Sequence, residues 1–255
     1  MSELISVDAG EVTTVTVDRP DTMNALTTGT VNALRDAIRD AEDRETRVLV
    51  ITGAGDEAFI AGGDLSRMAD LTPEAARTFA ERGHELCGAV ESFPAPVIAA
   101  INGHALGAGL ELALACDLRV ASERAILGEP EVELGVIPGF GGTQRLPRHV
   151  GDETARRLIF FGDRVDARDA QELGLVGDVV AHDELDAYVD ELATDLAEKP
   201  SGALAAAKAA LNERFESTVP EGLRAERDSF ADRFGTHDQR EGMTAFLEDR
   251  EPEFE

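Results

Sequence analysis

Apolar and polar residues alternate along residues 3–19, on both sides of Gly10, and this alternation predicts a hairpin of two strands. The apolar positions then recur at helical spacing over residues 27–43, which predicts an amphipathic helix that begins near Thr27. Residues 48–53 are mostly apolar and end in glycine, a pattern typical of a short strand that is buried on both faces. Strands and helices therefore follow one another from the beginning of the chain.

The same alternation continues to about residue 190. Helical spacing returns at residues 73–92, and two further apolar runs, at residues 97–101 and 118–121, predict buried strands. An alternation of strands and helices of this kind is typical of an α/β fold.

Strand patterns end near Ala193, and the rest of the chain has helical periodicity. Helices are predicted there over residues 203–213, 221–234 and 238–248. The composition changes near residues 199–202, Lys-Pro-Ser-Gly, which predicts a boundary. We therefore expect a core of residues 1–195 that holds the active site and a helical region of residues 196–255.

The composition is strongly acidic. The chain carries 51 Asp and Glu against 24 Lys and Arg, a net charge of −27, and its lysines are Lys199 and Lys208. A polyanion of this kind repels nucleic acid phosphates and anionic lipids, so we expect neither nucleic acid nor membrane as a partner. Acidic residues spread along the whole chain, scarce lysine and few aromatic residues predict the surface of a cytoplasmic protein from a halophile. An ordinary acidic enzyme is the alternative.

The remaining composition is that of a globular protein, with 43% hydrophobic residues. No apolar run approaches the roughly 20 residues that cross a bilayer, and the first residues lack the basic region of a signal peptide. Cys87 and Cys116 each lie in a helical pattern, so we expect no disulfide framework. These features predict a soluble, intracellular protein with reduced cysteines.

Three glycines between a predicted strand and a predicted helix, Gly103, Gly107 and Gly109, resemble part of a dinucleotide-binding fingerprint. Their spacing is G-x-x-x-G-x-G and not G-x-G-x-x-G, and Glu111 just inside the helix would repel a pyrophosphate group. Tyr188 lacks the lysine four residues later that forms the Tyr-x-x-x-Lys pair of short-chain dehydrogenases. The pattern therefore disfavours nucleotide binding.

Two carboxylates near small-residue turns indicate a different chemistry. Glu111 follows a Gly-Ala-Gly turn at the predicted start of a helix, and Glu131 lies in a Gly-Glu-Pro-Glu segment between two apolar runs. Gly63, in an Ala-Gly-Gly-Asp-Leu turn, offers another backbone N–H group. Such donors beside a pair of acid and base groups suit reactions of a carbonyl compound. Taken alone, a solvated position explains Glu111 better, and Glu131 is undistinguished.

The order of several motifs makes the combination specific, because it resembles that of the enoyl-CoA hydratase (crotonase) superfamily. The resemblance runs from Arg19 to Phe246 and so covers almost the whole chain. Each motif is weak by itself, and their shared order is a strong signal. The matching residues are 19–20, 24–26, 59–65, 102–112, 116–117, 128–131, 134–139, 141–146, 162, 167, 170, 174–176, 241–243 and 245–246.

This resemblance implies a spiral of ββα units followed by a C-terminal helical region that builds homotrimers, commonly paired into hexamers. It also implies acyl-CoA thioesters as substrates, with two backbone N–H groups, of Gly63 and Ala108, holding the thioester oxygen. Two glutamates hold the added water, and by position these are Glu111 and Glu131. Because both acids are present, a hydratase is favoured over an isomerase or a hydrolase. Coenzyme A is part of the substrate, and neither a metal nor a redox cofactor is expected.

The resemblance also suggests roles for individual residues. We expect Glu131 to deliver the proton to C2 and Glu111 to take a proton from water, although two carboxylates that share one water leave this division open. Asp64 is expected to cap the following helix, and Phe140 and Phe161 to line the acyl pocket or the core. The residues expected to contact substrate are Ala25, Leu26, Ala61, Gly62, Asp64, Leu65, Gly107, Pro138 and Gly139.

One departure from the family concerns coenzyme A. Members often keep a lysine near the C-terminus for its phosphates, where this chain has Asp249 beside Arg250. Arginines must then supply these contacts. The alternatives left open are an enoyl-CoA isomerase, a 3-hydroxyacyl-CoA dehydratase of another pathway, and a catalytically silent binding protein of the same fold. Some relatives bind RNA, which the net charge disfavours here.

Overall fold

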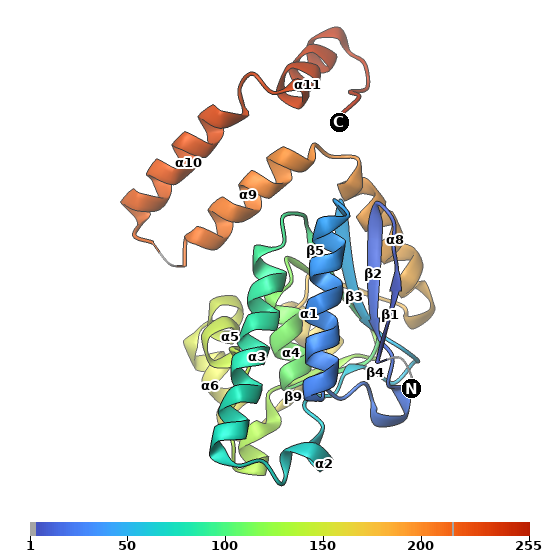
Figure 1. The fold of residues 1–255 in the computed structure, drawn as a ribbon, viewed down its shortest axis with the longest axis vertical. Coiled ribbons are helices and arrows are strands. Elements are labelled where there is room, and N and C mark those ends of the chain that lie inside the picture. Colours follow the sequence, from blue (N-terminus) through green and yellow to red (C-terminus); the bar gives the residue numbers. More distant parts are fainter. Residues whose placement is uncertain (1–3, 216) are drawn as a thin grey trace.

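The computed structural model of the protein describes residues 4–215 and 217–255. These residues form two sheets and the helices that cover them (Figure 1). The larger sheet has the order β1-β2-β3-β5-β7-β10, in which β1 and β2 are antiparallel and the other pairs are parallel. Its strands are β1 (Ile5–Asp8), β2 (Val12–Val17), β3 (Val48–Gly53), β5 (Val97–Ile101), β7 (Leu118–Ser122) and β10 (Asp178–Val180).

The smaller sheet has the order β4-β6-β8-β9, with β4, β6 and β8 parallel and β9 antiparallel to β8. Each parallel strand follows a strand of the larger sheet along the chain: β4 follows β3, β6 follows β5, and β8 follows β7. With the helices after them, these pairs confirm the expected spiral of ββα units. The strands are β4 (Ala58–Ile60), β6 (His104–Leu106), β8 (Ile126–Gly128) and β9 (Arg164–Asp166).

The predicted hairpin and the three predicted strands are confirmed, although the third, β7, is buried only from Val120 onward and Leu118 is 39% exposed. Residue 3, the first of the predicted hairpin, lies outside the described residues. Helix α1 (Thr28–Asp43) begins after Thr27, whose side chain accepts a hydrogen bond from the N–H of Thr30. Helix α3 (Pro73–Ser92) occupies the predicted range and packs beside α1 (Figure 1). The apolar faces of both helices join the larger sheet in the main core.

Shorter helices connect these elements and cover the sheets. The central one is α4 (Ala108–Ala115), every residue of which is buried. The others are α2 (Leu65–Met68), α5 (Gly142–Val150), α6 (Asp152–Phe161), α7 (Ala167–Glu172) and α8 (Leu185–Ala197), with 3₁₀ turns η1 (Pro20–Thr22), η2 (Pro130–Leu134) and η3 (His182–Glu184). The predicted boundary at residue 195 falls within α8, and the division into two regions stays a prediction.

The three C-terminal helices are also confirmed as α9 (Ser201–Glu213), α10 (Val219–Arg233) and α11 (His237–Glu248), and Figure 1 shows α10 and α11 away from both sheets. Lys208 fixes α9 to the core. Its Nζ lies 2.7 Å from Asp117 Oδ2 and donates to the carbonyl oxygens of Val90 and Ala95 at 3.2 and 3.1 Å. A buried ammonium that has three acceptors holds the helix in one position.

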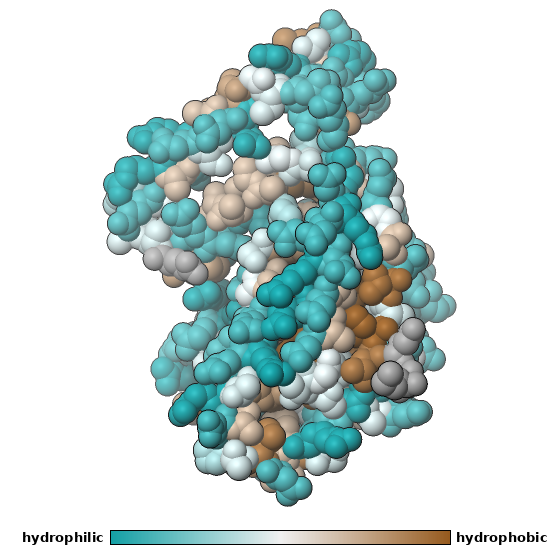
Figure 2. Space-filling model, in the orientation of Figure 1, coloured by the Kyte–Doolittle hydropathy of each residue, from teal (hydrophilic) through white to brown (hydrophobic). Residues whose placement is uncertain are grey.

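The surface is mainly hydrophilic, and Figure 2 shows this on one face, with a paler band over α9. Large apolar side chains are nevertheless exposed on the C-terminal helices. They are Leu211, Val219, Leu223, Phe230, Phe234, Met243, Phe246 and Leu247. Among the helices of the described residues, none is both long enough and apolar enough to span a bilayer.

Candidate active site

The smaller sheet brings the predicted site residues to one edge. Its three parallel strands pair Ala58 with His104 and Leu106 with Gly128, and the register between β4 and β6 shifts between Ala58 and Ile60. The carboxyl ends of parallel strands meet at the same edge of a sheet. Gly63 follows β4, α4 with Ala108 and Glu111 follows β6, and η2 with Glu131 follows β8. The short strands, which sequence periodicity did not predict, therefore position the whole site.

Glu111 lies in the first turn of α4 and is 1% exposed. Its Oε1 accepts hydrogen bonds from the N–H groups of Phe140, at 2.8 Å, and Gly142, at 2.6 Å. Burial raises the pKa of Glu111 above its ordinary value, and the backbone N–H donors oppose that rise. The side chain is therefore buried and held by the backbone, and the alternative of a solvated helix position is wrong.

The loop that supplies these donors is held by its own packing. The Phe140 ring is buried against Phe79, with ring centroids 5.1 Å apart, and against Gly83. Arg145 donates to both carboxylate oxygens of Glu91, at 2.8 and 2.6 Å, and to the carbonyl of Phe140 at 2.9 Å. A bidentate ion pair and a buried ring thus set where the N–H groups point.

Glu131 lies on the short 3₁₀ turn η2 and is partly buried. Gly107, with φ +51°, passes so close that a Cβ there would lie 2.4 Å from Glu131 Oε1. Only glycine fits this conformation and this approach. Burial raises the pKa of Glu131 to about 7, with the charge of Glu111 contributing. A carboxyl group with this pKa can give or take a proton at neutral pH.

A third carboxyl group, Glu129, belongs to the same cluster. It is fully buried, and one oxygen from each of Glu111, Glu129 and Glu131 lies within 4.8 Å of the others. Clusters of this kind neutralise their charge with protons or with a divalent cation. The sequence analysis missed Glu129. Its place directly after an apolar strand was the only available signal.

The two predicted N–H donors lie at turns of the chain. Gly63 forms a β-bridge with Leu26, in which the N–H of Leu26 bonds Gly62 and that of Asp64 bonds Leu26. These two hydrogen bonds involve the carbonyl of Gly62 and the N–H of Asp64, the residues on either side of Gly63. Ala108 is the first residue of α4, where N–H groups have no partner in the helix. Within the described residues, neither N–H donates to a protein acceptor.

Asp64 corrects one expectation. It stands at the N-cap position of α2, but its side chain forms no capping bond. Instead its Oδ2 lies 3.0 Å from Arg19 Nη2, and its Oδ1 accepts from Ser66 Oγ at 2.6 Å. The pKa of Asp64 is lowered, chiefly by the Ser66 hydrogen bond. The ion pair with a distant arginine replaces the local cap and ties the Gly63 turn to the N-terminal segment.

The other residues expected to contact substrate lie around these turns. Ala25, Ala61 and Gly62 flank the bridge at Gly63, and Leu65 is 53% exposed.

Pro138 and Gly139 directly precede Phe140, whose N–H bonds the Glu111 carboxylate. Phe140 packs in the core, whereas Phe161 is 65% exposed and lies under Arg157.

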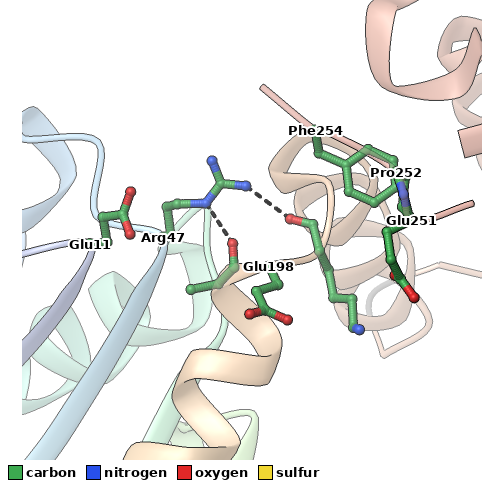
Figure 3. Close-up of a pocket in the computed structure, with 8 residues that line it drawn as sticks. Glu11, Arg47, Glu198, Glu251, Pro252 and Phe254 are labelled. Atoms are coloured by element: carbon green, nitrogen blue, oxygen red, sulfur yellow. Dashed lines mark hydrogen bonds between the residues drawn. The ribbon is translucent and has the colours of Figure 1, made fainter. Parts of the chain in front are cut away.

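Outside this cluster, the arginines nearest to a surface hollow and to the C-terminus form structural bonds within the protein. Figure 3 shows a hollow near the start of β3, where Arg47 donates to the carbonyls of Ala197 and Lys199 at 2.8 and 3.0 Å. These bonds fasten the α8–α9 connection. Arg250, beside the position of the missing lysine, is paired with Glu241 at 2.6 Å. The buried Cys87 and Cys116 are both free.

Comparison with known proteins gives consistent matches over the whole chain. Residues 8–255 match the family model described as Enoyl-CoA hydratase/isomerase. Crotonyl-CoA hydratase of Syntrophomonas wolfei is 43% identical over 239 residues, which cover 93% of this chain and 92% of that protein. Short-chain-enoyl-CoA hydratase of Clostridium acetobutylicum is 39% identical over 254 residues, covering 99% and 97%. The crystal structure of an enoyl-CoA hydratase from Bacillus anthracis has a TM-score of 0.95 at 39% identity and covers 99% of both chains.

Proposed function

The chain belongs to the enoyl-CoA hydratase/isomerase family, and on that premise we propose that it adds water across the 2,3 double bond of a trans-2-enoyl-CoA. The product is a 3-hydroxyacyl-CoA. The observation that carries the proposal is the approach of Glu111 and Glu131 at one sheet edge, beside turns whose N–H groups have no protein acceptor within the described residues. The reaction requires this set of a base, an acid and donors for the thioester oxygen.

We assign Glu111 as the base. Two N–H groups hold its Oε1, which leaves Oε2 to accept a proton from water. As the water oxygen bonds to C3, that proton passes to Glu111, and the electrons of the double bond move toward the thioester oxygen. Glu131 then gives its proton to C2. The pKa of about 7 supports this role, because a large fraction of Glu131 is protonated at neutral pH.

The N–H groups of Gly63 and Ala108 are the donors to the thioester oxygen in this proposal. Negative charge develops on that oxygen during the reaction, and fixed donors stabilise it without reorganisation, by about 2.7–4 kcal/mol each in comparable sites. The position of Ala108 at the start of α4 adds the positive end of the helix dipole. Coenzyme A enters as part of the substrate, and the proposed steps need no separate cofactor.

A short acyl chain is the substrate class we favour, because two relatives about 40% identical over their length are named crotonyl-CoA and short-chain-enoyl-CoA hydratase. The proposed assembly is a homotrimer or homohexamer. It is supported by the apolar side chains of α10 and α11, such as the 86% exposed Phe246, which a monomer would leave in water. A cytoplasmic location stays a prediction of the sequence. Adaptation to high salt is supported by the net charge of −27.

Glu111→Gln and Glu131→Gln test the proposal. With crotonyl-CoA as substrate, loss of the enoyl-thioester absorbance measures hydration. Each variant should keep its fold and lose about 10²–10⁴-fold in kcat, the usual effect of removing a positioned acid or base. The exposed Glu153→Gln on α6 is a matched control and should hydrate at the wild-type rate. Wild-type hydration by either site variant would remove that residue from the mechanism, and an inactive wild-type protein would refute the proposed activity.

A further inference from the structure

Glu129 is a buried ionisable group that the proposed mechanism does not use. Its side chain is 0% exposed, and neither of its carboxyl oxygens has a hydrogen-bond donor within the described residues. An isolated buried carboxylate is very unfavourable, so a native protein either neutralises such a group or pairs it. The surroundings of Glu129 decide which of these applies.

The charged groups around Glu129 come from four elements. Glu111 on α4 and Glu131 on η2 are acidic and lie beside it. Two arginines occur on the neighbouring elements, but Arg145 on α5 is paired with Glu91, and Arg164 on β9 is paired with Glu133. Within the described residues, Glu129 forms no ion pair. No cation therefore balances it, and two of its neighbours repel its charge.

The three carboxyl groups differ in the donors they receive. Glu111 accepts two backbone N–H groups, whereas Oε2 of Glu131 and both oxygens of Glu129 are buried without a donor. One carboxyl oxygen of Glu129 lies within 4.8 Å of one of Glu131, and both oxygens of Glu129 and Oε2 of Glu131 are buried. Two ionised carboxylates only accept, so a hydrogen bond between them forms only if one carries a proton.

We propose that Glu129 is a positioning residue that stays protonated at neutral pH and donates its O–H to Oε2 of Glu131. This inference rests on the proposed function for its catalytic meaning, but the protonation itself does not. The hydrogen bond orients the Glu131 carboxyl group and stabilises its charged form after the proton has gone to C2. Burial acts in the same direction on Glu129, since it raises the pKa of that carboxyl well above its ordinary range.

Two variants separate the donor from the side-chain volume. Glu129→Gln keeps an N–H donor but has no proton to lose, and Glu129→Leu keeps the approximate size but has no donor. At pH 7, kcat/KM for crotonyl-CoA should fall no more than about 3-fold in Glu129→Gln and about 10–100-fold in Glu129→Leu, because a charged group loses its hydrogen bond only in the second. Equal losses in the two variants would show that shape alone matters and would overturn the proposal.

The pH profile is the readout that a merely structural role would not change. In the wild type, kcat/KM should fall as Glu131 ionises and fall more steeply at higher pH, where Glu129 ionises too. Glu129→Gln should keep the decline caused by Glu131 and lose the steeper decline at higher pH. Glu129→Leu should move the first decline to higher pH, because the donor that favours ionised Glu131 is gone. Profiles that coincide in all three proteins would contradict the assignment.

Infrared difference spectra test the proton without any turnover. At pH 7 the wild-type spectrum minus that of Glu129→Gln should contain the C=O stretch of a protonated carboxyl group. Its absence would refute the proposal even if hydration proceeds, whereas its presence in a protein that does not hydrate crotonyl-CoA would refute only the proposed function. Added Mg²⁺ should leave both the band and the rate unchanged. Loss of the band on adding Mg²⁺ would show that a cation, and not a proton, neutralises Glu129, and would overturn the proposal.

Discussion

Gly83, in the middle of α3, allows a sharp test of how the site is supported. A Cβ added there would lie 2.1 Å from Phe140 Cδ1. Non-bonded carbon atoms prefer about 3.5–4.0 Å, so the Phe140 ring must move by more than about 1 Å. The N–H of Phe140 holds Glu111 Oε1 at 2.8 Å. The methyl group of Gly83→Ala should therefore disturb the Glu111 carboxylate, the proposed base, without touching it.

The size of the effect follows from two opposing contributions. Overpacking a buried site costs about 1–3 kcal/mol, and replacing a helical glycine by alanine gains about 0.5–1 kcal/mol. Gly88 lies on the same helix and has nothing within 4 Å of an added Cβ, so Gly88→Ala should show the gain alone. The free energies of unfolding of the two variants should differ by about 1–3 kcal/mol. Misplacement of the carboxylate should lower kcat about 10–100-fold in Gly83→Ala only.

Equilibrium urea denaturation at constant salt gives the stability of both variants, and crotonyl-CoA hydration at saturating substrate gives kcat. Gly83→Ala should unfold at lower urea than Gly88→Ala and turn over more slowly. If the two variants match in stability and rate, the contact between Gly83 and Phe140 does not support Glu111, and the argument from packing to chemistry is refuted.

Four further outcomes are expected. Ala108→Pro should abolish hydration because proline has no N–H, whereas Ala108→Gly should retain much of the rate. A folded and active proline variant would exclude the N–H of residue 108 as a donor to the thioester oxygen. Lys208→Met should lower the free energy of unfolding, measured by chemical denaturation, by about 2–4 kcal/mol, because it leaves Asp117 without its partner. The exposed Lys199→Met is the control and should lower it by about 0.5 kcal/mol or less. As the pH rises from 7 to 9, Glu131 loses its acidic proton, so kcat/KM should fall at least about 50-fold for a pKa of about 7. A constant rate would exclude Glu131 as the acid. Thermal melts and light scattering should show higher stability and an intact oligomer in about 2 M salt than in about 0.1 M, and no difference would refute salt adaptation.

The long elements could be predicted because each spans several periods of its pattern. Helix α3 matches its predicted range, and Thr27 caps α1 by a bond to a residue three positions later. The strands of the smaller sheet could not be predicted in this way. Each has three residues, too few to establish a two-residue alternation, and each pairs with a strand more than 20 residues away in the sequence. The predicted N-cap role of Asp64 was wrong for a similar reason, because its side chain pairs with Arg19, which is distant in the sequence.

The candidate site could likewise be predicted only as far as its features follow from local sequence. The types and order of the residues were enough to propose Glu111 and Glu131, through a family resemblance, but not to say that Glu111 is buried. That property arises when the loop before α5 closes over α4 and two N–H groups meet its carboxylate. Glu129 was overlooked because adjacent acids suggest a solvated segment, whereas the fold buries it completely beside Glu111 and Glu131.

Three glutamates with the same intrinsic acidity thus lie in different surroundings within one small volume. Burial raises the pKa of all three, backbone N–H donors oppose that rise at Glu111, the neighbouring carboxylates add to it at Glu129, and the pKa of Glu131 reaches about 7. Hydration needs one carboxyl group that is ionised and one that is protonated at the same pH. Identical side chains can meet that need only if their surroundings differ, so the loop at Gly142 and the turn at Gly107 matter to the chemistry as much as the acids themselves.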